Sequence, residues 1–194
     1  MKYLFIFIIM STGLSLTAQD QNLPYYEIPD YPEEYTAGSV ASRLVDGLGM
    51  RFYWATEGLR EVDLAFRPSL EARTCGETIE HIYGMSINIL NATTKTINVP
   101  GQNKQLPFPE MRKATLENLQ AASKRLLNST DAEMKEYKMI FKRGESTSEF
   151  PFWNEINGPI SDCLWHVGQV ITFRRSSGNP YNNKVSVLTG KVRQ

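Results

Sequence analysis

Apolar side chains recur at intervals of three and four residues in four long stretches of this chain, and that interval is the period of an α-helix. The first stretch runs from Tyr35 to Leu59, and its apolar positions are Val40, Leu44, Leu48, Phe52 and Ala55. The same stretch contains the glycines Gly38, Gly47 and Gly49. Glycine weakens a helix but lets a second helix approach closely. We therefore predict a helix with a close contact at one or more of these glycines.

The second stretch begins with a helix-capping signal. Thr74 resembles an N-cap, and Glu77 three residues later completes a capping box. The predicted helix ends near Asn91, and one face of it is formed by Thr78, Ile82, Met85 and Ile89. His81 and Glu77 border this face, so the pattern places a histidine beside the core.

The third and fourth stretches complete the pattern. Pro109 opens a helix that ends near Leu127, with an inner side predicted from Leu116, Leu119, Leu126 and Leu127. The fourth helix runs from Phe152 to Arg175, and Pro159 marks either a kink or its true start. It ends at the stop signal of residues 176–180.

The segments between these stretches predict connections. Residues 94–108, rich in Asn, Gly, Pro and Thr, and residues 146–151 are both predicted as loops. Residues 135–143 alternate charged and apolar side chains, so a short strand and a helix tail are both open. Four long helices with long interhelical loops predict an all-α fold, a single four-helix bundle.

The first residues are typical of an export signal. Lys2 precedes an almost wholly apolar run from Tyr3 to Met10, which is shorter than the roughly 20 residues needed to span a membrane. We expect a signal peptide over residues 1–19, an extended leader over 20–34, and a helical domain with a C-terminal tail over 35–194. This division predicts an exported, periplasmic protein with no stable membrane insertion after signal removal. An uncleaved N-terminal anchor is the alternative.

Charge and cysteine content narrow the function classes. The chain has 21 basic and 21 acidic residues and no basic run interleaved with aromatics, so we expect no nucleic-acid partner. Cys75 and Cys163 are an even pair, for which a disulfide and two buried thiols are both open. The sequence contains no Gly-x-Ser-x-Gly elbow, no phosphate-binding glycine loop and no paired Cys-x-x-Cys zinc motif.

The two histidines of the chain carry the candidate chemistry. Asp162 and His166 are four residues apart, so they lie on one face of a helix, and Gln169 continues that stripe. If His81 faces them from the other helix, the three side chains form a metal site with open coordination. In the simpler interpretation, Asp162, His166 and Gln169 are the solvated side of an apolar helix.

Two neighbouring residues have possible roles beside these ligands. Glu77 is a further ligand, a partner that orients the His81 imidazole, or only the glutamate of the capping box. Trp165, beside His166, is the best candidate for lining a substrate cavity. Trp54 and Trp153 are predicted to lie in the core or in a pocket wall.

Three features of the chain occur together in one known family. They are the connection Asp-Leu-Ala-Phe-Arg-Pro at residues 63–68, His81 in the middle of the second predicted helix, and the run from His166 to Gln169. On these features, residues 36–178 resemble the DinB-like (YfiT-like) metal-binding four-helix bundles. The family pattern has one histidine on the second helix and His-x-x-x-His-x-x-Gln on the fourth. Asp162 replaces the first histidine of that pair, which either tunes the metal or marks the loss of the site.

The resemblance implies a divalent metal bound by His81, Asp162 and His166, with Gln169 bonded to a ligand or to the bound water. Zinc or nickel is expected, and manganese or iron also suits two histidines and a carboxylate. The implied activity is a metal-dependent thiol transferase that activates a thiol or a water toward a small-molecule substrate. A metal-dependent hydrolase and a non-catalytic exported binding protein are the alternatives, and a homodimer is open.

Overall fold

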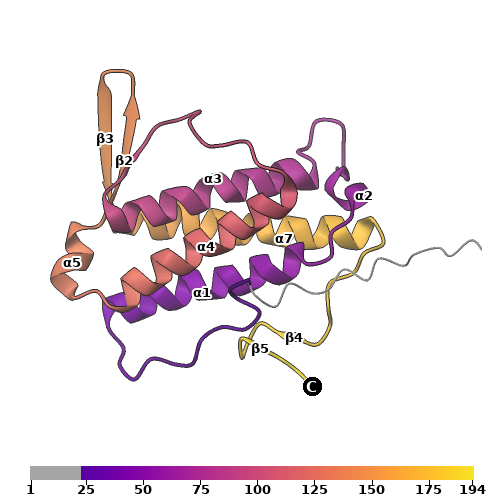
Figure 1. The fold of residues 1–194 in the computed structure, drawn as a ribbon, viewed down its shortest axis with the longest axis horizontal. Helices are drawn as coiled ribbons and strands as arrows, with labels where there is room; N and C mark the ends of the chain where they lie inside the picture. Colours follow the sequence, from indigo (N-terminus) through magenta and orange to yellow (C-terminus); the bar gives the residue numbers. More distant parts are fainter. Residues whose placement is uncertain (1–22) are drawn as a thin grey trace, which may run out of the picture.

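The computed structural model describes residues 23–194, and the predicted signal peptide lies outside the described residues. Four long helical segments dominate this part of the chain (Figure 1). They are α1 (Ala37–Thr56), α3 (Cys75–Thr94), α4 (Phe108–Leu127) and a last helix formed by α6 (Phe152–Glu155), a π-helical turn (Ile156–Ile160) and α7 (Ser161–Ser176). Short helices α2 (Glu61–Leu64) and α5 (Asp131–Glu136) lie between them. The predicted all-α class is thus confirmed in its helical content.

The long helices pack side by side, with α1 and α3 each in contact with both α4 and α7. Arg112, near the start of α4, donates to Thr56 at the end of α1 over 3.0 Å, so these two helices run in opposite directions. Arg174, near the end of α7, donates to the carbonyl of Trp54 over 2.9 Å, so α7 runs parallel to α1. Residues 95–107 return along α3 to the start of α4 (Figure 1), which makes α3 and α4 parallel.

Two predicted core faces are corrected by the structure. Val40 and Leu44 of α1 are 49% and 40% exposed, whereas Leu48 and Phe52 are buried. Four helical residues turn the chain through 400°, so a strict series of four-residue steps drifts around the helix and leaves the core-facing side. Leu127 is 46% exposed because it directly follows Leu126, which points into the core. The predicted faces of α3 and of the remaining α4 leucines are confirmed as buried.

The structure contains strands where loops were predicted. β2 (Lys138–Arg143) pairs antiparallel with β3 (Ser146–Pro151), and the short β1 (Ile97–Asn98) pairs parallel with β2. The loop predictions for residues 146–151 and for part of 94–108 were therefore wrong. Every side chain of β3 is exposed, so no alternation of apolar and polar residues marks it in the sequence. The strand alternative for residues 135–143 is confirmed over β2.

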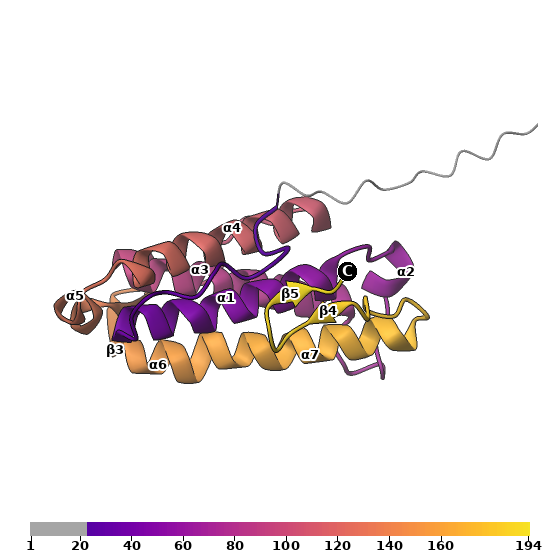
Figure 2. The same cartoon turned by 90° about the horizontal axis from the view of Figure 1, so that it is seen from below.

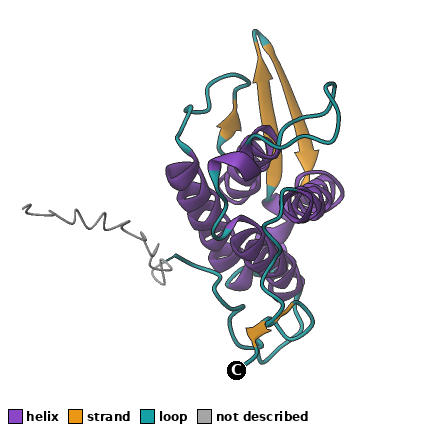
Figure 3. Ribbon diagram, turned by 90° about the vertical axis from the view of Figure 1, so that its right-hand side faces the viewer, coloured by secondary structure: helices purple, strands orange, loops and turns teal. Residues whose placement is uncertain are grey.

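A second pair of strands lies in the C-terminal tail. β4 (Val185–Ser186) pairs antiparallel with β5 (Lys191–Val192), on the side of the helices away from β2 and β3 (Figure 3). Val185 in this tail is buried, whereas Leu188 is 92% exposed. None of the helices within residues 23–194 is long and apolar enough to cross a membrane.

Residues 23–34, which belong to the predicted extended leader, form a strap that packs along α1 (Figure 2). Leu23, Tyr25 and Ile28 of this strap are buried in the core cluster. A Cβ atom at Gly49 would lie 2.5 Å from the Tyr25 ring, so this glycine gives the strap access to the helix. The predicted close contact between helices occurs at Gly38, where a Cβ would meet the Leu126 carbonyl oxygen.

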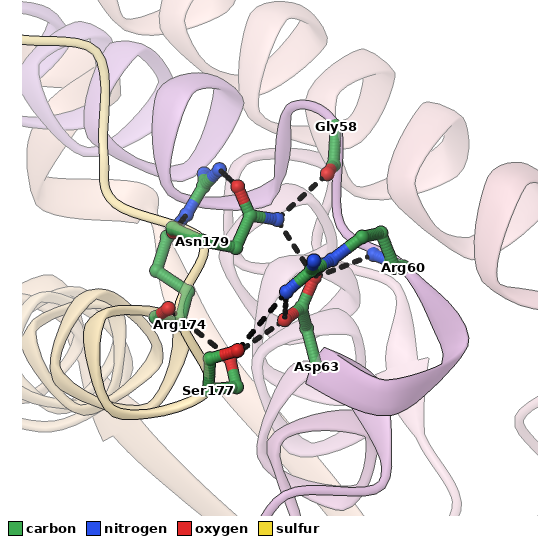
Figure 4. Close-up of polar contacts among 6 residues, drawn as sticks. All are labelled: Gly58, Arg60, Asp63, Arg174, Ser177 and Asn179. Carbon is green, nitrogen blue, oxygen red and sulfur yellow. Dashed lines mark hydrogen bonds and ion pairs between the residues drawn. The ribbon is translucent and has the colours of Figure 1, made fainter.

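The buried carboxylate of Asp63 connects the short helix α2 to the end of α7 (Figure 4). Asp63 accepts hydrogen bonds from the Arg60 guanidinium, from Ser177 Oγ at 2.6 Å and from Asn179 Nδ2 at 2.7 Å. These contacts, chiefly the one with Arg60, hold the pKa of the fully buried Asp63 well below its usual range. Asp63 therefore fixes α2 against the end of α7.

Both cysteines are buried free thiols, so the structure has the second of the two predicted alternatives. Burial raises the pKa of Cys75 to about 11 and raises the pKa of Cys163 still further. Both side chains are protonated at neutral pH and act as small apolar groups in the core.

Candidate metal centre

The first ligand position depends on the start of α3. Thr74 Oγ1 accepts from the Glu77 amide at 3.0 Å, and Glu77 Oε2 accepts from the Thr74 amide at 2.6 Å. This reciprocal pair confirms the predicted capping box and fixes the first turn of the helix. Glu77 therefore caps the helix and is outside the candidate ligand group. His81 follows one turn later.

The other two ligand positions depend on the π-helical turn in the last helix. The core-facing residues of this helix are Phe152, Glu155, Ile160, Cys163, Val167, Val170 and Arg174. Their spacing is three or four except for one interval of five, which spans the π turn. Pro159 lacks an amide hydrogen, and a wider turn relieves its clash with the preceding carbonyl. The kink predicted at Pro159 is thus a π turn, and it keeps both halves of the helix facing the core.

Asp162, His166 and Gln169 border this core-facing side where α7 meets α3. The Nε2 atom of His81 lies 3.4 Å from Asp162 Oδ2, and that of His166 lies 3.5 Å from Asp162 Oδ1. One ligand atom from each of the three residues lies within 4.8 Å of the other two. The imidazole rings are 4.8 Å apart between centroids and nearly perpendicular. The fold thus brings the three predicted ligands together.

These contacts are longer than good hydrogen bonds. Nitrogen–oxygen hydrogen bonds cluster at about 2.7–3.2 Å. Ligands at about 2.1 Å from a tetrahedral metal are about 3.4 Å from one another. The two separations from Asp162 are close to this second value, but they end on different oxygens of the carboxylate. With one ligand atom from each residue, the group lies within 4.8 Å and could hold a divalent ion.

Gln169 fixes the tautomer of His166. Its Oε1 lies 2.7 Å from His166 Nδ1, so the amide oxygen accepts the Nδ1 hydrogen. The lone pair of the imidazole is then on Nε2, which is the nitrogen that faces Asp162. A hydrogen bond of this kind orients a metal-binding histidine and raises its basicity. Gln169 is thus in contact with one of the three candidate ligands.

The electrostatic surroundings keep His81 available as a ligand. Its partial burial and the positive charge of Arg73 lower the pKa of His81, although Asp162 acts in the opposite direction. The neutral imidazole retains the lone pair that a metal ion requires. Arg73 was not predicted as part of the site, because it precedes the helix and its proximity to His81 depends on the fold of residues 67–73.

A hollow of about 840 Å³ lies beside His81, along the outward side of α3. Its walls come from residues 67–73, from residues 97–105 and from Phe141 and Arg143 of β2. Trp165 does not line it and is 73% exposed, so the structure does not support its predicted role in a cavity wall. Trp153 is also exposed, and only Trp54 is buried as predicted. Side chains one position from a ligand on a helix point about 100° away from it.

Comparison of this chain with protein-family models, with curated proteins and with solved structures finds no match.

Proposed function

We propose that this protein binds one divalent metal ion through His81, Asp162 and His166 and uses it in metal-dependent group transfer to a small molecule. The observation that carries the proposal is the grouping of one possible ligand atom from each of these three residues within 4.8 Å. A solvated polar stripe on one helix has no need to meet a histidine from another helix. Two nitrogens and one carboxylate oxygen suit zinc or nickel, and also manganese or iron.

The four long helices are proposed to form a four-helix bundle of the DinB-like type. Support comes from the position of His81 on the second long helix and of His166 and Gln169 on the fourth. The helices α3 and α7, which carry the candidate ligands, are in direct contact, and the long segment 95–107 joins the parallel helices α3 and α4. Asp162 at the first ligand position of α7 is the departure from the family pattern.

The bound ion supplies Lewis acidity, which lowers the pKa of a coordinated thiol or water and favours a nucleophile at neutral pH. The protein side chains have separate tasks. Asp162 contributes the negative charge that offsets the ion, and Gln169 holds His166 in its ligand tautomer. His81 borders the hollow, so a small-molecule substrate bound there lies next to the metal centre.

Metal content tests the binding proposal first. Protein purified without chelators is expected to contain one equivalent of divalent metal by elemental analysis, and His166→Ala should lose it. Trp165→Phe is the matched control, because this exposed neighbour is on the same helix and should leave the metal content unchanged. A chain that takes up none of zinc, nickel, manganese or iron would contradict the proposal and favour a non-catalytic binding protein.

Turnover tests the type of reaction. Activity of the metal-loaded protein that requires an added small thiol identifies the proposed transferase, with the metal-bound thiol as nucleophile. Turnover of esters or amides without a thiol identifies the alternative hydrolase, in which water takes that place. Metal-loaded protein without either activity would contradict the catalytic part of the proposal while leaving the metal site intact.

Export and self-association are separate parts of the proposal. The apolar run after Lys2 supports export, and a cut near Ala18 or Gln19 is expected to leave a periplasmic protein. Fractionation of cells, with N-terminal sequencing of the mature chain, tests this directly. A full-length chain in the cytoplasm would contradict export. Sedimentation of the mature protein tests whether it is a homodimer.

A further inference from the structure

A second hollow, separate from the metal centre, lies under the strap. It has a volume of about 490 Å³ and is enclosed by strap residues 25–32, by α1 and by α4. None of the three candidate metal ligands lines it. Its size is within the range of about 300–1,000 Å³ that is usual for small-molecule sites.

The floor of this hollow contains a buried network of hydroxyl groups around one carboxylate. Asp46 of α1 accepts hydrogen bonds from Tyr25 Oη at 3.0 Å and from Ser123 Oγ at 2.5 Å. Ser123 also lies 2.8 Å from Ser42 Oγ. All four residues line the hollow and are more than nine-tenths buried. The network joins the strap, α1 and α4 at one point.

One oxygen of this carboxylate is left for a ligand. Both hydrogen bonds end on Oδ1, and Oδ2 has no partner among residues 23–194. Oδ2 is not sealed inside the protein and keeps some accessible surface. Asp46 is one of the residues that line the hollow, where an accessible Oδ2 can meet a ligand. A buried carboxylate oxygen in this position favours a ligand that carries a hydrogen-bond donor, above all a cation.

The other charged side chains around the hollow determine which charges the ligand must carry. Glu27 and Asp30 are both paired with Lys191. Arg43 and Lys124 line the hollow without a carboxylate partner among the described residues, and each has donor hydrogens to spare. A simple cation would be repelled by these two side chains. A ligand with an acid group as well as an ammonium group satisfies both sets of charges.

We propose that this hollow binds a small zwitterion of the amino-acid type, with its ammonium group on Asp46 Oδ2 and its acid group toward Arg43 and Lys124. Ile28, Pro32 and Leu127 supply apolar wall, which suits a short apolar portion of the ligand. Burial raises the pKa of Asp46, although the hydrogen bonds from Ser123 and Tyr25 and the positive charge of Arg43 act in the opposite direction. A bound ammonium group would add a positive charge beside the buried carboxylate.

Titration calorimetry with glycine, L-leucine and L-glutamate tests the proposal. At least one of these zwitterions is expected to bind at micromolar to millimolar concentration. The amide of the binding amino acid lacks the acid group, and its N-acetyl form lacks the ammonium group. Each is expected to bind at least about tenfold more weakly, the effect of one lost charged hydrogen bond. No binding by any of the three, or equal binding by both derivatives, overturns the proposal.

Two variants locate the site. Asp46→Asn keeps an oxygen for Tyr25 and Ser123 but presents an amide to the ligand, and should abolish binding. Lys124 is exposed at the rim of the hollow, so Lys124→Gln leaves the strap contacts intact. This variant should weaken binding about two- to fivefold. Lys113→Gln, an exposed lysine of α4 outside the hollow, should change nothing. Unchanged affinity in both Asp46→Asn and Lys124→Gln would refute the assignment even if the amino acid binds elsewhere. If Asp46→Asn unfolds, the Lys124 and Lys113 pair decides the outcome.

Discussion

Glu155 is the residue whose position in the core is hardest to reconcile with its charge. Its side chain is fully buried, and neither carboxylate oxygen has a hydrogen-bond partner within residues 23–194. Burial raises its pKa to about 8 from the ordinary value of 4.5. The carboxyl group is therefore largely protonated at neutral pH, because an unpaired charge in this environment is costly.

This pKa predicts how the stability of the protein depends on pH. The folded state binds the Glu155 proton more tightly than the unfolded state, so this group favours folding most at pH below 4.5. Its contribution falls as the pH rises from 4.5 through about 8. Glu155→Gln should flatten this fall and be more stable than the parent above pH 8.

Chemical denaturation across that pH range measures the effect of Glu155→Gln. Glu145→Gln is the control, because Glu145 lies at the exposed turn between β2 and β3. The prediction is wrong if the parent and Glu155→Gln have parallel stability curves between pH 5 and pH 9.

A second residue-scale prediction concerns Gln169, which orients the imidazole ring of His166. Gln169→Ala removes the acceptor for His166 Nδ1, so the ring can rotate and change its tautomer. We expect the metal affinity to fall by roughly 10–100-fold, as for other residues that orient a ligand. Competition with a chromophoric chelator gives the affinity.

Two variants separate orientation of His166 from general damage to α7. Gln169→Glu keeps an oxygen acceptor and should retain tight binding. Thr172→Ala removes only a bond from Thr172 Oγ1 to the Gly168 carbonyl of the same helix, and should bind normally. Equal affinities for Gln169→Ala and Thr172→Ala would remove the proposed role of Gln169.

At the scale of elements, the packing of the strap against α1 depends on Gly49. A methyl group at Gly49 would collide with the Tyr25 ring, whereas one at Gly47 would meet only the end of the Arg51 side chain, at 3.2 Å. Both positions are inside α1, so both alanine substitutions gain the same helix propensity, up to about 1 kcal/mol. Gly49→Ala should nevertheless destabilise the protein by about 1–3 kcal/mol through overpacking. Gly47→Ala should be neutral or stabilising.

Urea denaturation measures the free energy of unfolding of the two glycine variants. Gly47→Ala is the control, because it should not destabilise the protein. Displacement of the strap in Gly49→Ala should also expose Tyr26, whose carbonyl accepts from Trp54 Nε1 in the parent. A change in tryptophan fluorescence is then expected for Gly49→Ala alone. Equal stability of the two variants would show that the strap yields to the methyl group.

At the scale of the whole molecule, the proposed metal joins two helices that are far apart in the sequence. A ligand that binds only the folded state stabilises it by about 2.7 kcal/mol when present at a hundred times its Kd. For a chain of this length, each 1 kcal/mol raises Tm by roughly 2–4 °C. Zinc should therefore raise the Tm of the protein, and a chelator should reverse the change.

His166→Ala provides the control for this thermal shift, since it removes a ligand at the contact between α3 and α7. Its Tm should not respond to zinc. A shift of the same size in the parent and in His166→Ala would mean that zinc stabilises the chain at some other place.

The sequence by itself determined the four long helices, the capping box of Thr74 and Glu77, and the stripe of Asp162, His166 and Gln169. These features depend on contacts within one turn of helix, so their spacing is written in the chain. It also marked Pro159 as either a kink or a helix start, because proline removes a backbone donor wherever it occurs. The candidate ligands were predictable because helical periodicity fixes which residues share a face.

Only the tertiary structure decided which faces meet. The distance between His81 and Asp162 depends on how α3 packs against α7, and no local pattern contains it. The burial of Tyr25 and Ile28 depends on a surface provided by α1, and the free oxygen of Asp46 depends on the strap above it. The exposed strand β3 is stabilised by its pairing with β2, which an unpatterned sequence does not show. Side-chain periodicity reports the geometry of one element, whereas these features arise from contacts between elements.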